Sequence, residues 1–467
     1  MTKKTRFSPM SRRSFLKGMG AVGAGLGAGL GSTLPAFAKS ARLQDTANLS
    51  LWWWADDLTF GGWIEDTIAA YEAANPGVNI ESLQQDVCCV ISQFTTAAAA
   101  GEPPDIAFLF NGLYHMENVW LGYLDPVNNY IPLEIIEQSN ATALSRYQGN
   151  YYRVGWYPVP LVWEYNKDVW DQAGLDADNP PATWDEWMAA LETLKTAGFT
   201  PFGGGLSDGF WGEWYLGNAL TQALDSPGEA VELFIGDRDF REPKYWEFWT
   251  KLEEMARGGY LNDDMLSVDL FTAINKVVTG ELAATQNVGA VIPSHIAQIG
   301  DRVGLMTMPV YGQGALAGVP ITDSQGWGIP TATENKEIAA DFITFMQTPE
   351  RLNRFWEMNH YFPANRTWDS SVIDDPVIQL MWDKWVAGNI TVYIPNLMPG
   401  LFWTDAMFVS AQEIVAGNMT GEQAGEQNAQ VAQQWRDLNP DLIENYRIYA
   451  QSLAEAENAT LEATEEA

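Results

Sequence analysis

Three apolar runs near the start of the chain decide its fold: LSLWWW at residues 49–54, VNIESL at residues 78–83 and DIAFLF at residues 105–110. A helical pattern separates each run from the next, and the first of these helices stops at the breaker Asn75-Pro76-Gly77. This β-α-β-α-β alternation predicts an α/β protein with an open, mostly parallel sheet. In such sheets, ligand-binding loops follow the carboxyl ends of the strands.

The same alternation continues through the rest of the chain. A helix is expected from Trp184 to Thr196, and strands are expected near residues 282–286, 303–308 and 326–329. With 467 residues, of which 46% are apolar, the chain is long enough for two or three domains with large cores.

Acidic residues dominate the composition. The chain has 60 Asp and Glu against 26 Lys and Arg, a formal net charge of −34. This charge repels nucleic-acid phosphates and anionic lipid head groups, so we expect neither as a partner. Three His residues are too few for most metal or general-base chemistry, so no metal, cofactor or catalytic residue is expected. The 21 Trp residues predict exposed stacking surfaces, because each buried indole N–H needs a partner.

Residues 1–38 are predicted to be an export signal. The segment Ser11-Arg12-Arg13-Ser14-Phe15-Leu16-Lys17 resembles the twin-arginine motif, and a Gly/Ala-rich stretch from Gly18 to Leu34 follows it. Ala36-Phe37-Ala38 provides a cleavage site, so we expect a mature chain that starts near Lys39. The apolar stretch is too short and too rich in glycine to favour a membrane span. The expected location is the periplasm.

Short motifs spread along nearly the whole mature chain carry a family resemblance. They include Tyr71-Glu72-x-x-Asn75-Pro76-Gly77, Gly101-Glu102-Pro103-Pro104-Asp105-Ile106, Glu164-Tyr165-Asn166-Lys167-Asp168, Gly326-Trp327-Gly328-Ile329-Pro330 and Tyr361-Phe362-Pro363-Ala364. In this order and spacing the chain resembles the extracellular solute-binding proteins of ABC importers, in the sugar-binding family that includes maltose-binding protein. The resemblance implies a type II periplasmic binding protein-like fold, with two α/β lobes and a ligand cleft between them.

The resemblance also implies where the lobes begin and end. Lobe 1 would comprise residues 39–158 and 326–368, and lobe 2 residues 161–312 and 376–467. Hinge segments would lie near residues 157–160, 310–325 and 367–376. The implied function is that of an exported, monomeric substrate-binding component. It would bind a neutral sugar, oligosaccharide or sugar-like polyol and deliver it to the transmembrane subunits of an ABC importer.

A sugar site needs aromatic faces for the C–H patches of the ring and polar side chains for its hydroxyls. The family places such residues after strands and in lobe 2. The matching positions here are Trp54, Asp56, Asp57, Asn111, Trp211, Asn287, Trp327 and Trp403. The frequent Trp shortly after Asn287 is replaced by Ala290. Structural roles compete at several positions: a helix N-cap for Asp56, a loop turn for Asn111 and core packing for Trp403.

Two further features admit more than one interpretation. Cys88 and Cys89 are adjacent, and in an oxidising compartment they could close a strained ring disulfide or remain two buried thiols. Trp residues together with carboxylates would also suit a cationic solute such as a polyamine or a betaine. A ring of Asp and Glu around the aromatics would favour that alternative.

Enzymes are the competing class. Gly205-Leu206-Ser207-Asp208-Gly209 matches the G-x-S-x-G nucleophile elbow, and His295 or His360 could complete a triad. No oxyanion loop of the HGGG kind precedes it. A glycosidase with two carboxylates is a second enzymatic alternative, although 60 acidic residues make any pairing meaningless without geometry. The sequence therefore favours a binding protein over a secreted hydrolase.

Overall fold

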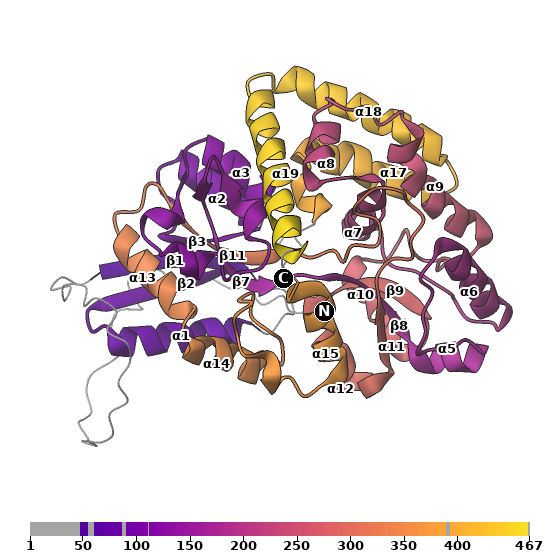
Figure 1. The fold of residues 1–467 in the computed structure, drawn as a ribbon, viewed down its shortest axis with the longest axis horizontal. Coiled ribbons are helices and arrows are strands. Elements are labelled where there is room, and N and C mark those ends of the chain that lie inside the picture. The colour runs from indigo at the N-terminus through magenta and orange to yellow at the C-terminus, as the bar shows by residue number, and fades with distance from the viewer. Residues whose placement is uncertain (1–46, 55–59, 86–89, 111, 389–392, 466–467) are drawn as a thin grey trace, which may run out of the picture. The chain divides into compact units, whose positions relative to one another are not determined.

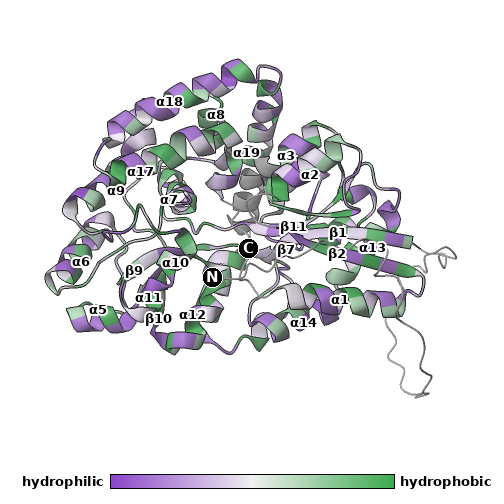
Figure 2. Ribbon diagram, turned by 180° about the vertical axis from the view of Figure 1, so that it is seen from behind, coloured by the Kyte–Doolittle hydropathy of each residue, from purple (hydrophilic) through white to green (hydrophobic). Residues whose placement is uncertain are grey.

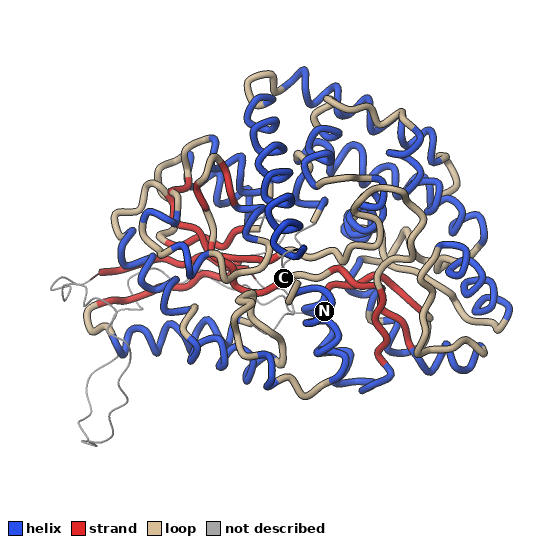
Figure 3. Tube along the Cα trace, in the orientation of Figure 1, coloured by secondary structure: helices blue, strands red, loops and turns tan. Residues whose placement is uncertain are grey.

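The computed structural model describes residues 47–465, apart from residues 55–59, 86–89, 111 and 389–392. Two main sheets organise this part of the chain, and Figure 3 shows their strands as two separate groups of red tube. None of the helices within the described ranges combines the length and the apolar character that a membrane crossing requires.

The first sheet has the strand order β2-β1-β3-β11-β4, with β7 paired to β11. Its strands are β1 (Ala47–Trp54), β2 (Val78–Gln85), β3 (Ile106–Leu109), β4 (Leu124–Asp125), β7 (Val154–Pro158) and β11 (Ser324–Pro330). The β1 strand pairs in parallel with β2 and β3, as the sequence predicts. The β11 strand runs antiparallel to β3, β4 and β7. The expectation of a mostly parallel sheet therefore holds only for its N-terminal half.

Helices cover both faces of this sheet. In Figure 1, α1 (Gly61–Ala74) and α14 (Pro349–Asn359) run along one face, while α2 (Val90–Ala99) and α3 (Leu113–Trp120) lie on the other. A hydrogen bond of 2.9 Å from Trp63 Nε1 to the carbonyl oxygen of Arg351 ties α1 to α14 across 288 residues of sequence. The helix α13 (Lys336–Met346) follows β11 and packs against α1 and α14.

The second sheet is antiparallel, with the order β10-β8-β9. Its strands are β8 (Leu161–Asn166), β9 (Ala284–Val288) and β10 (Val303–Met306). The β9 and β10 strands lie within a few residues of the strands predicted near residues 282–286 and 303–308. The helix α6 spans Trp184–Thr196 as predicted. Its start is fixed by a capping box, in which Thr183 and Glu186 each bond the other's backbone N–H.

The remaining helices around the second sheet come from two distant parts of the sequence. They are α5 (Lys167–Ala173), α7 (Phe210–Leu220), α8 (Pro227–Phe234), α9 (Pro243–Gly258), α10 (Leu270–Ile274), α11 (Lys276–Thr279), α12 (Ile292–Ile299), α15 (Pro376–Met381), α16 (Gly400–Phe402), α17 (Val409–Val415) and α18 (Gly421–Leu438). The long α18 alternates hydrophilic and hydrophobic residues in Figure 2, since one side packs on α9 and the other faces solvent.

The chain crosses between the two sheets where β7 leads into β8 and where β10 leads into β11. Val159 and Asp323 exchange backbone hydrogen bonds here, with N···O distances of 2.8 and 3.3 Å. The buried Arg153 donates to Ser324 Oγ at 3.0 Å. Burial lowers the pKa of Arg153 to about 10, and the charge of Asp323 partly opposes this shift. Asn396 Nδ2 also donates to the Asp323 carboxylate at 2.7 Å, which anchors a third segment at the crossing.

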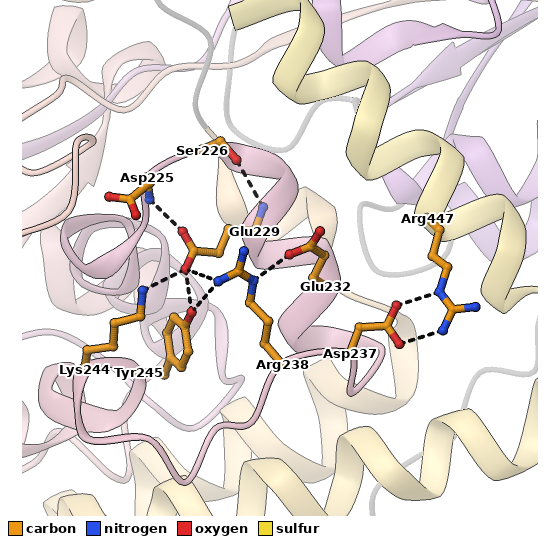
Figure 4. A network of polar contacts seen from close by, with 9 residues as sticks. All are labelled: Asp225, Ser226, Glu229, Glu232, Asp237, Arg238, Lys244, Tyr245 and Arg447. Carbon is orange, nitrogen blue, oxygen red and sulfur yellow. Dashed lines mark hydrogen bonds and ion pairs between the residues drawn. The ribbon is translucent and has the colours of Figure 1, made fainter.

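The C-terminal helix α19 (Ile443–Glu465) packs against α8 and against the segment Thr142–Tyr147. Tyr449 Oη donates to the carbonyl oxygen of Leu144 at 2.7 Å, whereas Arg447 forms a two-pronged ion pair with Asp237 at 2.7 and 2.8 Å. Figure 4 shows this pair beside α8.

A neighbouring network in the same view centres on Glu229. This carboxylate accepts hydrogen bonds from Lys244 Nζ at 2.9 Å and from Arg238 at 3.0 Å, and the Asp225 N–H donates to it at 2.7 Å. Burial alone would raise the pKa of Glu229. The hydrogen bonds and the charge of Arg238 outweigh burial, so the pKa is lowered and the carboxylate stays ionised.

Most of the 21 Trp residues are buried, contrary to the surplus of exposed stacking surfaces expected from composition. A few indole N–H groups find backbone acceptors inside: Trp170 donates to Ala283 at 3.2 Å and Trp385 to Leu161 at 3.1 Å. Others pack in aromatic groups, such as Trp163 on Phe202 with ring centroids 4.6 Å apart. The many Trp residues of this protein therefore fill large aromatic cores.

Candidate functional site

One aromatic group lies where β1 and β3 end. The Trp54 ring is 5.6 Å from Phe110 in a stacked arrangement and 5.8 Å from Phe108 in an edge-to-face arrangement. Trp54 itself is 7% exposed, while Phe110 is half-buried. The predicted ligand residues Asp56, Asp57 and Asn111 and the cysteines Cys88 and Cys89 lie outside the described residues.

A second aromatic group lies between α7 and the helical segment after residue 400. Trp403 opens a turn of π-helix, η9 (Trp403–Phe408), a widened geometry that occurs frequently at functional sites. Its half-buried ring stacks on Phe408 at 5.9 Å with an interplanar angle of 10°. It also meets the half-buried Phe210 at 5.6 Å and 52°. Trp403 is thus the predicted ligand residue that combines aromatic neighbours with exposed ring surface.

Glu213, in the first turn of α7, supplies the polar contact of this group. Trp403 Nε1 donates to Glu213 Oε2 at 2.8 Å. The Glu213 side chain is buried, and burial raises its pKa to about 7, although the hydrogen bond from Trp403 acts in the opposite direction. No ion pair joins Glu213 to a basic side chain within the described part of the chain.

The 3-10 turn η8 (Ile394–Leu397) links the two aromatic groups. A Cβ atom at Gly112, two residues after Phe110, would collide with the backbone of Asn396. On the other side of η8, a Cβ atom at Gly217 in α7 would lie 2.7 Å from Pro395. Glycine therefore permits the close approach on both sides of η8. The end of β3 and the helix that carries Glu213 border the same turn.

Two of the predicted ligand residues are fully buried. Trp211 stacks on Tyr215 at 5.4 Å and 6°, and a Cβ atom at Gly204 would overlap its ring. Trp327, in the middle of β11, packs against Trp156 at 4.7 Å. Protein side chains cover both rings, so neither offers a face to a ligand in this conformation.

The predicted ligand residue Asn287 belongs to a buried network. Its Nδ2 donates to Glu164 Oε2 at 2.7 Å, and its Oδ1 accepts the N–H of Val288. His295 Nδ1 lies 2.8 and 3.0 Å from the two oxygens of the same carboxylate. The amide of Asn287 is therefore engaged in bonds within the second sheet.

Both nitrogens of the buried His295 ring have polar neighbours. Nδ1 faces the Glu164 carboxylate, and Nε2 lies 3.2 Å from Asn275 Oδ1. The Asn275 amide is oriented by its own bond from Nδ2 to the carbonyl oxygen of Phe271 at 2.7 Å. Both ring nitrogens of His295 therefore lie within hydrogen-bond distance of oxygen atoms.

The geometry does not assemble a Ser-His-Asp triad around Ser207. The Ser207 side chain is exposed, and its backbone N–H donates to the carbonyl oxygen of Val268 at 3.1 Å. His295 is committed to Glu164 and Asn275, and His360 ends α14 beside Trp356. The described residues also contain no group of three or more His, Cys, Asp or Glu side chains placed to hold a metal ion.

The ligand residues predicted from the sequence do not include Phe210, Glu213 or Phe408. A partial signal was present, since Gly209 and Gly212 flank one turn of α7. A Cβ atom at Gly209 would overlap the Phe408 ring, and one at Gly212 would lie 2.9 Å from Ala411. The two glycines indicate a close helix contact, but the identity of the facing segment, 190 residues away, has no local signature.

Two sheets, each covered by helices and joined by crossing segments, give the type II periplasmic binding protein-like fold. The chain belongs to the bacterial extracellular solute-binding protein family, which matches residues 66–379. Residues 9–29 match the twin-arginine translocation signal. The protein is therefore an exported, periplasmic solute-binding protein and not an enzyme, as predicted from the sequence.

Relatives agree with this family, and solved structures agree with the fold. A protein of Brucella abortus (strain 2308) named as a binding protein is 24% identical over 325 residues, which cover 66% of this chain and 73% of the relative. The sn-glycerol-3-phosphate-binding periplasmic protein UgpB of Rhizobium meliloti (strain 1021) is 27% identical over 44% of this chain and 47% of its own length. A chitin oligosaccharide binding protein superposes with a TM-score of 0.73 at 21% identity, over 84% of this chain and 99% of that one.

Proposed function

We propose that this protein is the substrate-binding component of an ABC importer and binds a neutral sugar, oligosaccharide or sugar-like polyol. The ligand would lie between lobe 1 (residues 39–158 and 326–368) and lobe 2 (residues 161–312 and 376–467). Its binding would shift the two lobes from an open to a closed arrangement. The observation that carries the proposal is Trp403. It presents partly exposed ring surface within an aromatic group, and a buried carboxyl holds its indole N–H.

The surrounding residues favour a neutral ligand over a phosphorylated one. Phosphate recognition uses Arg or Lys side chains or the N–H groups of a helix N-terminus. No ion pair or cation–π contact brings a basic side chain to Trp403 or Glu213 within the described residues. The segments 55–59, 86–89, 111 and 389–392 contain neither Lys nor Arg in the sequence. This distinguishes the proposal from the ligand named for the UgpB relative.

A cationic solute is the second candidate, and Glu213 favours it. A buried carboxyl without a basic partner among the described residues, next to aromatic rings, is a setting that a ligand ammonium group could complete. Such binding would ionise Glu213 and release a proton, whereas binding of a neutral sugar would not require this.

A thermal-shift screen of the purified mature protein separates these candidates. The panel contains neutral mono- and oligosaccharides, polyols, sn-glycerol 3-phosphate, betaines and polyamines. A ligand at about 100 times its Kd stabilises the folded state by about 2.7 kcal/mol. Stabilisation by a neutral sugar or polyol supports the first proposal. Stabilisation by amines or by the phosphate ester alone contradicts it.

Trp403→Ala then tests the site with the ligand found. Loss of a stacked aromatic platform should weaken binding by about 2–4 kcal/mol, roughly 30- to 1000-fold, and Trp403→Phe should recover part of this loss. Trp356→Ala is a matched control, since Trp356 is a half-buried Trp on α14. Lower thermal stability of Trp403→Ala with wild-type affinity would remove Trp403 from the site.

A further inference from the structure

Three contacts determine how the Trp403 ring is held. Phe408 covers one ring face at 5.9 Å, and Phe210 meets the ring at 5.6 Å with a tilt of 52°. These aromatic contacts restrict the ring less tightly than a hydrogen bond does, because each pairwise dispersion attraction is small. The third contact, from Nε1 to Glu213 Oε2 at 2.8 Å, is directional and fixes the edge of the indole.

Glu213 reaches Trp403 because α7 and η9 approach each other closely. Gly209 has a φ of +83° and lies against the Phe408 ring, where any Cβ atom would overlap it. One turn later, Gly212 faces Ala411 and Met407. The absence of side chains at these two positions places the first turn of α7 directly on η9. This arrangement directs the Glu213 side chain to the indole edge of Trp403.

Glu213 occupies this position at a cost to stability. Its side chain is 7% exposed, and neither an ion pair nor a second hydrogen bond compensates its burial within the described residues. Two other buried acidic side chains among the described residues have such partners: Glu229 has two basic partners, and Glu164 has His295. The one described partner of the Glu213 carboxyl is the partly exposed Trp403. Glu213 therefore contributes to the orientation of Trp403 rather than to the stability of the core.

We propose that Glu213 is the positioning residue of the Trp403 platform: its carboxyl holds the indole plane at the angle that the ligand meets. This inference rests on the proposed function for its effect on ligand binding. Its structural part, the orientation of Trp403, holds for the unliganded protein. A ring held in advance loses less rotational freedom when ligand stacks on it, so the hydrogen bond increases affinity without touching the ligand.

The test uses the full mature protein labelled with 5-fluorotryptophan and observed by fluorine NMR. The Trp403 resonance is identified as the signal that disappears in Trp403→Phe. Glu213→Leu removes the acceptor at similar volume, and Glu213→Gln keeps an acceptor oxygen. Glu253→Leu is the control, since Glu253 is also buried and lies on α9. If Glu213→Leu does not fold, Glu213→Ala takes its place.

The expected result is a shifted, broadened or doubled Trp403 resonance in Glu213→Leu, and a single resonance near the wild-type position in Glu213→Gln and Glu253→Leu. An unchanged Trp403 resonance in Glu213→Leu overturns the proposal, whether or not a ligand is known.

With the sugar or polyol found in the screen, Glu213→Leu should weaken binding by about 3- to 10-fold, and Glu213→Gln should restore most of that loss. Equal affinities of the wild type and Glu213→Leu would contradict the role in binding. If no sugar or polyol binds the wild-type protein, the proposed function fails, while the fluorine spectra still decide whether Glu213 orients Trp403.

Discussion

Removing His295 should destabilise the fold severely, because it leaves the buried Glu164 side chain without the ring that contacts both of its carboxyl oxygens. The side chains of His295 and Glu164 are 0% and 1% exposed. Nδ1 of His295 lies 2.8 and 3.0 Å from the two carboxylate oxygens, and Asn287 provides the one other described side-chain donor. Removal of one partner from a buried ion pair costs about 3–5 kcal/mol. We expect a loss of this size for His295→Leu at neutral pH.

A double-mutant cycle shows whether this loss comes from the pair itself. Glu164→Leu alone leaves the imidazole and the Asn287 amide without their acceptor, and should cost a similar amount. The combination of both Leu substitutions removes the two polar side chains together. Since apolar replacement of a buried pair is often close to neutral, the double variant should lose at least about 2 kcal/mol less than the sum of the two singles.

Urea unfolding of the unliganded mature protein measures these free energies by linear extrapolation. Asn275→Ala is the control: it removes the acceptor of His295 Nε2 at an exposed position, where water can replace it. We expect this variant to cost no more than about 1 kcal/mol. If the double variant loses the sum of the two single losses, within about 0.5 kcal/mol, His295 and Glu164 are not a coupled buried pair.

Two further predictions concern the site and its support. The pKa of Glu213 is raised from 4.5 to about 7, so the folded state should lose about 3 kcal/mol of stability as the pH rises from 4.5 to 7. Urea midpoints measured at pH 5 and pH 8 should show this loss in the wild type and a smaller one in Glu213→Gln. An equal change of the midpoint between the two pH values in both proteins would contradict this prediction. Gly209→Ala should cost about 2–4 kcal/mol through overlap with Phe408 and its positive φ, whereas Gly417→Ala, with a positive φ but open space, should cost about 1 kcal/mol. Similar unfolding free energies for both variants would exclude the overlap.

Much of the fold was predictable because its signals are local. The breaker at Asn75-Pro76-Gly77 ends α1, and the capping box of Thr183 and Glu186 starts α6 where the sequence predicts. The twin-arginine motif is read as a linear segment, so the export signal needed no structure. The family motifs are also short runs at fixed spacing, which a single sequence displays in full.

The site was predictable only in part. Trp403 and Trp54 were selected, and both contact other aromatic rings in the structure. Trp211 and Trp327 were selected as well, but both rings are fully covered by their neighbours. A Trp in a loop and a Trp in a core have the same sequence appearance, since the side chains that cover the ring come from distant segments.

The sequence by itself determined the alternation of strands and helices, the export signal and the family, because these depend on residues that are neighbours along the chain. Only the tertiary structure decided that β11 runs antiparallel, that Asn287 and His295 both contact Glu164, and that Glu213 meets Trp403 across 190 residues. Such pairings depend on which faces pack together. Packing is a property of the whole folded chain, where burial and hydrogen bonding select among many partners that local patterns leave equally possible.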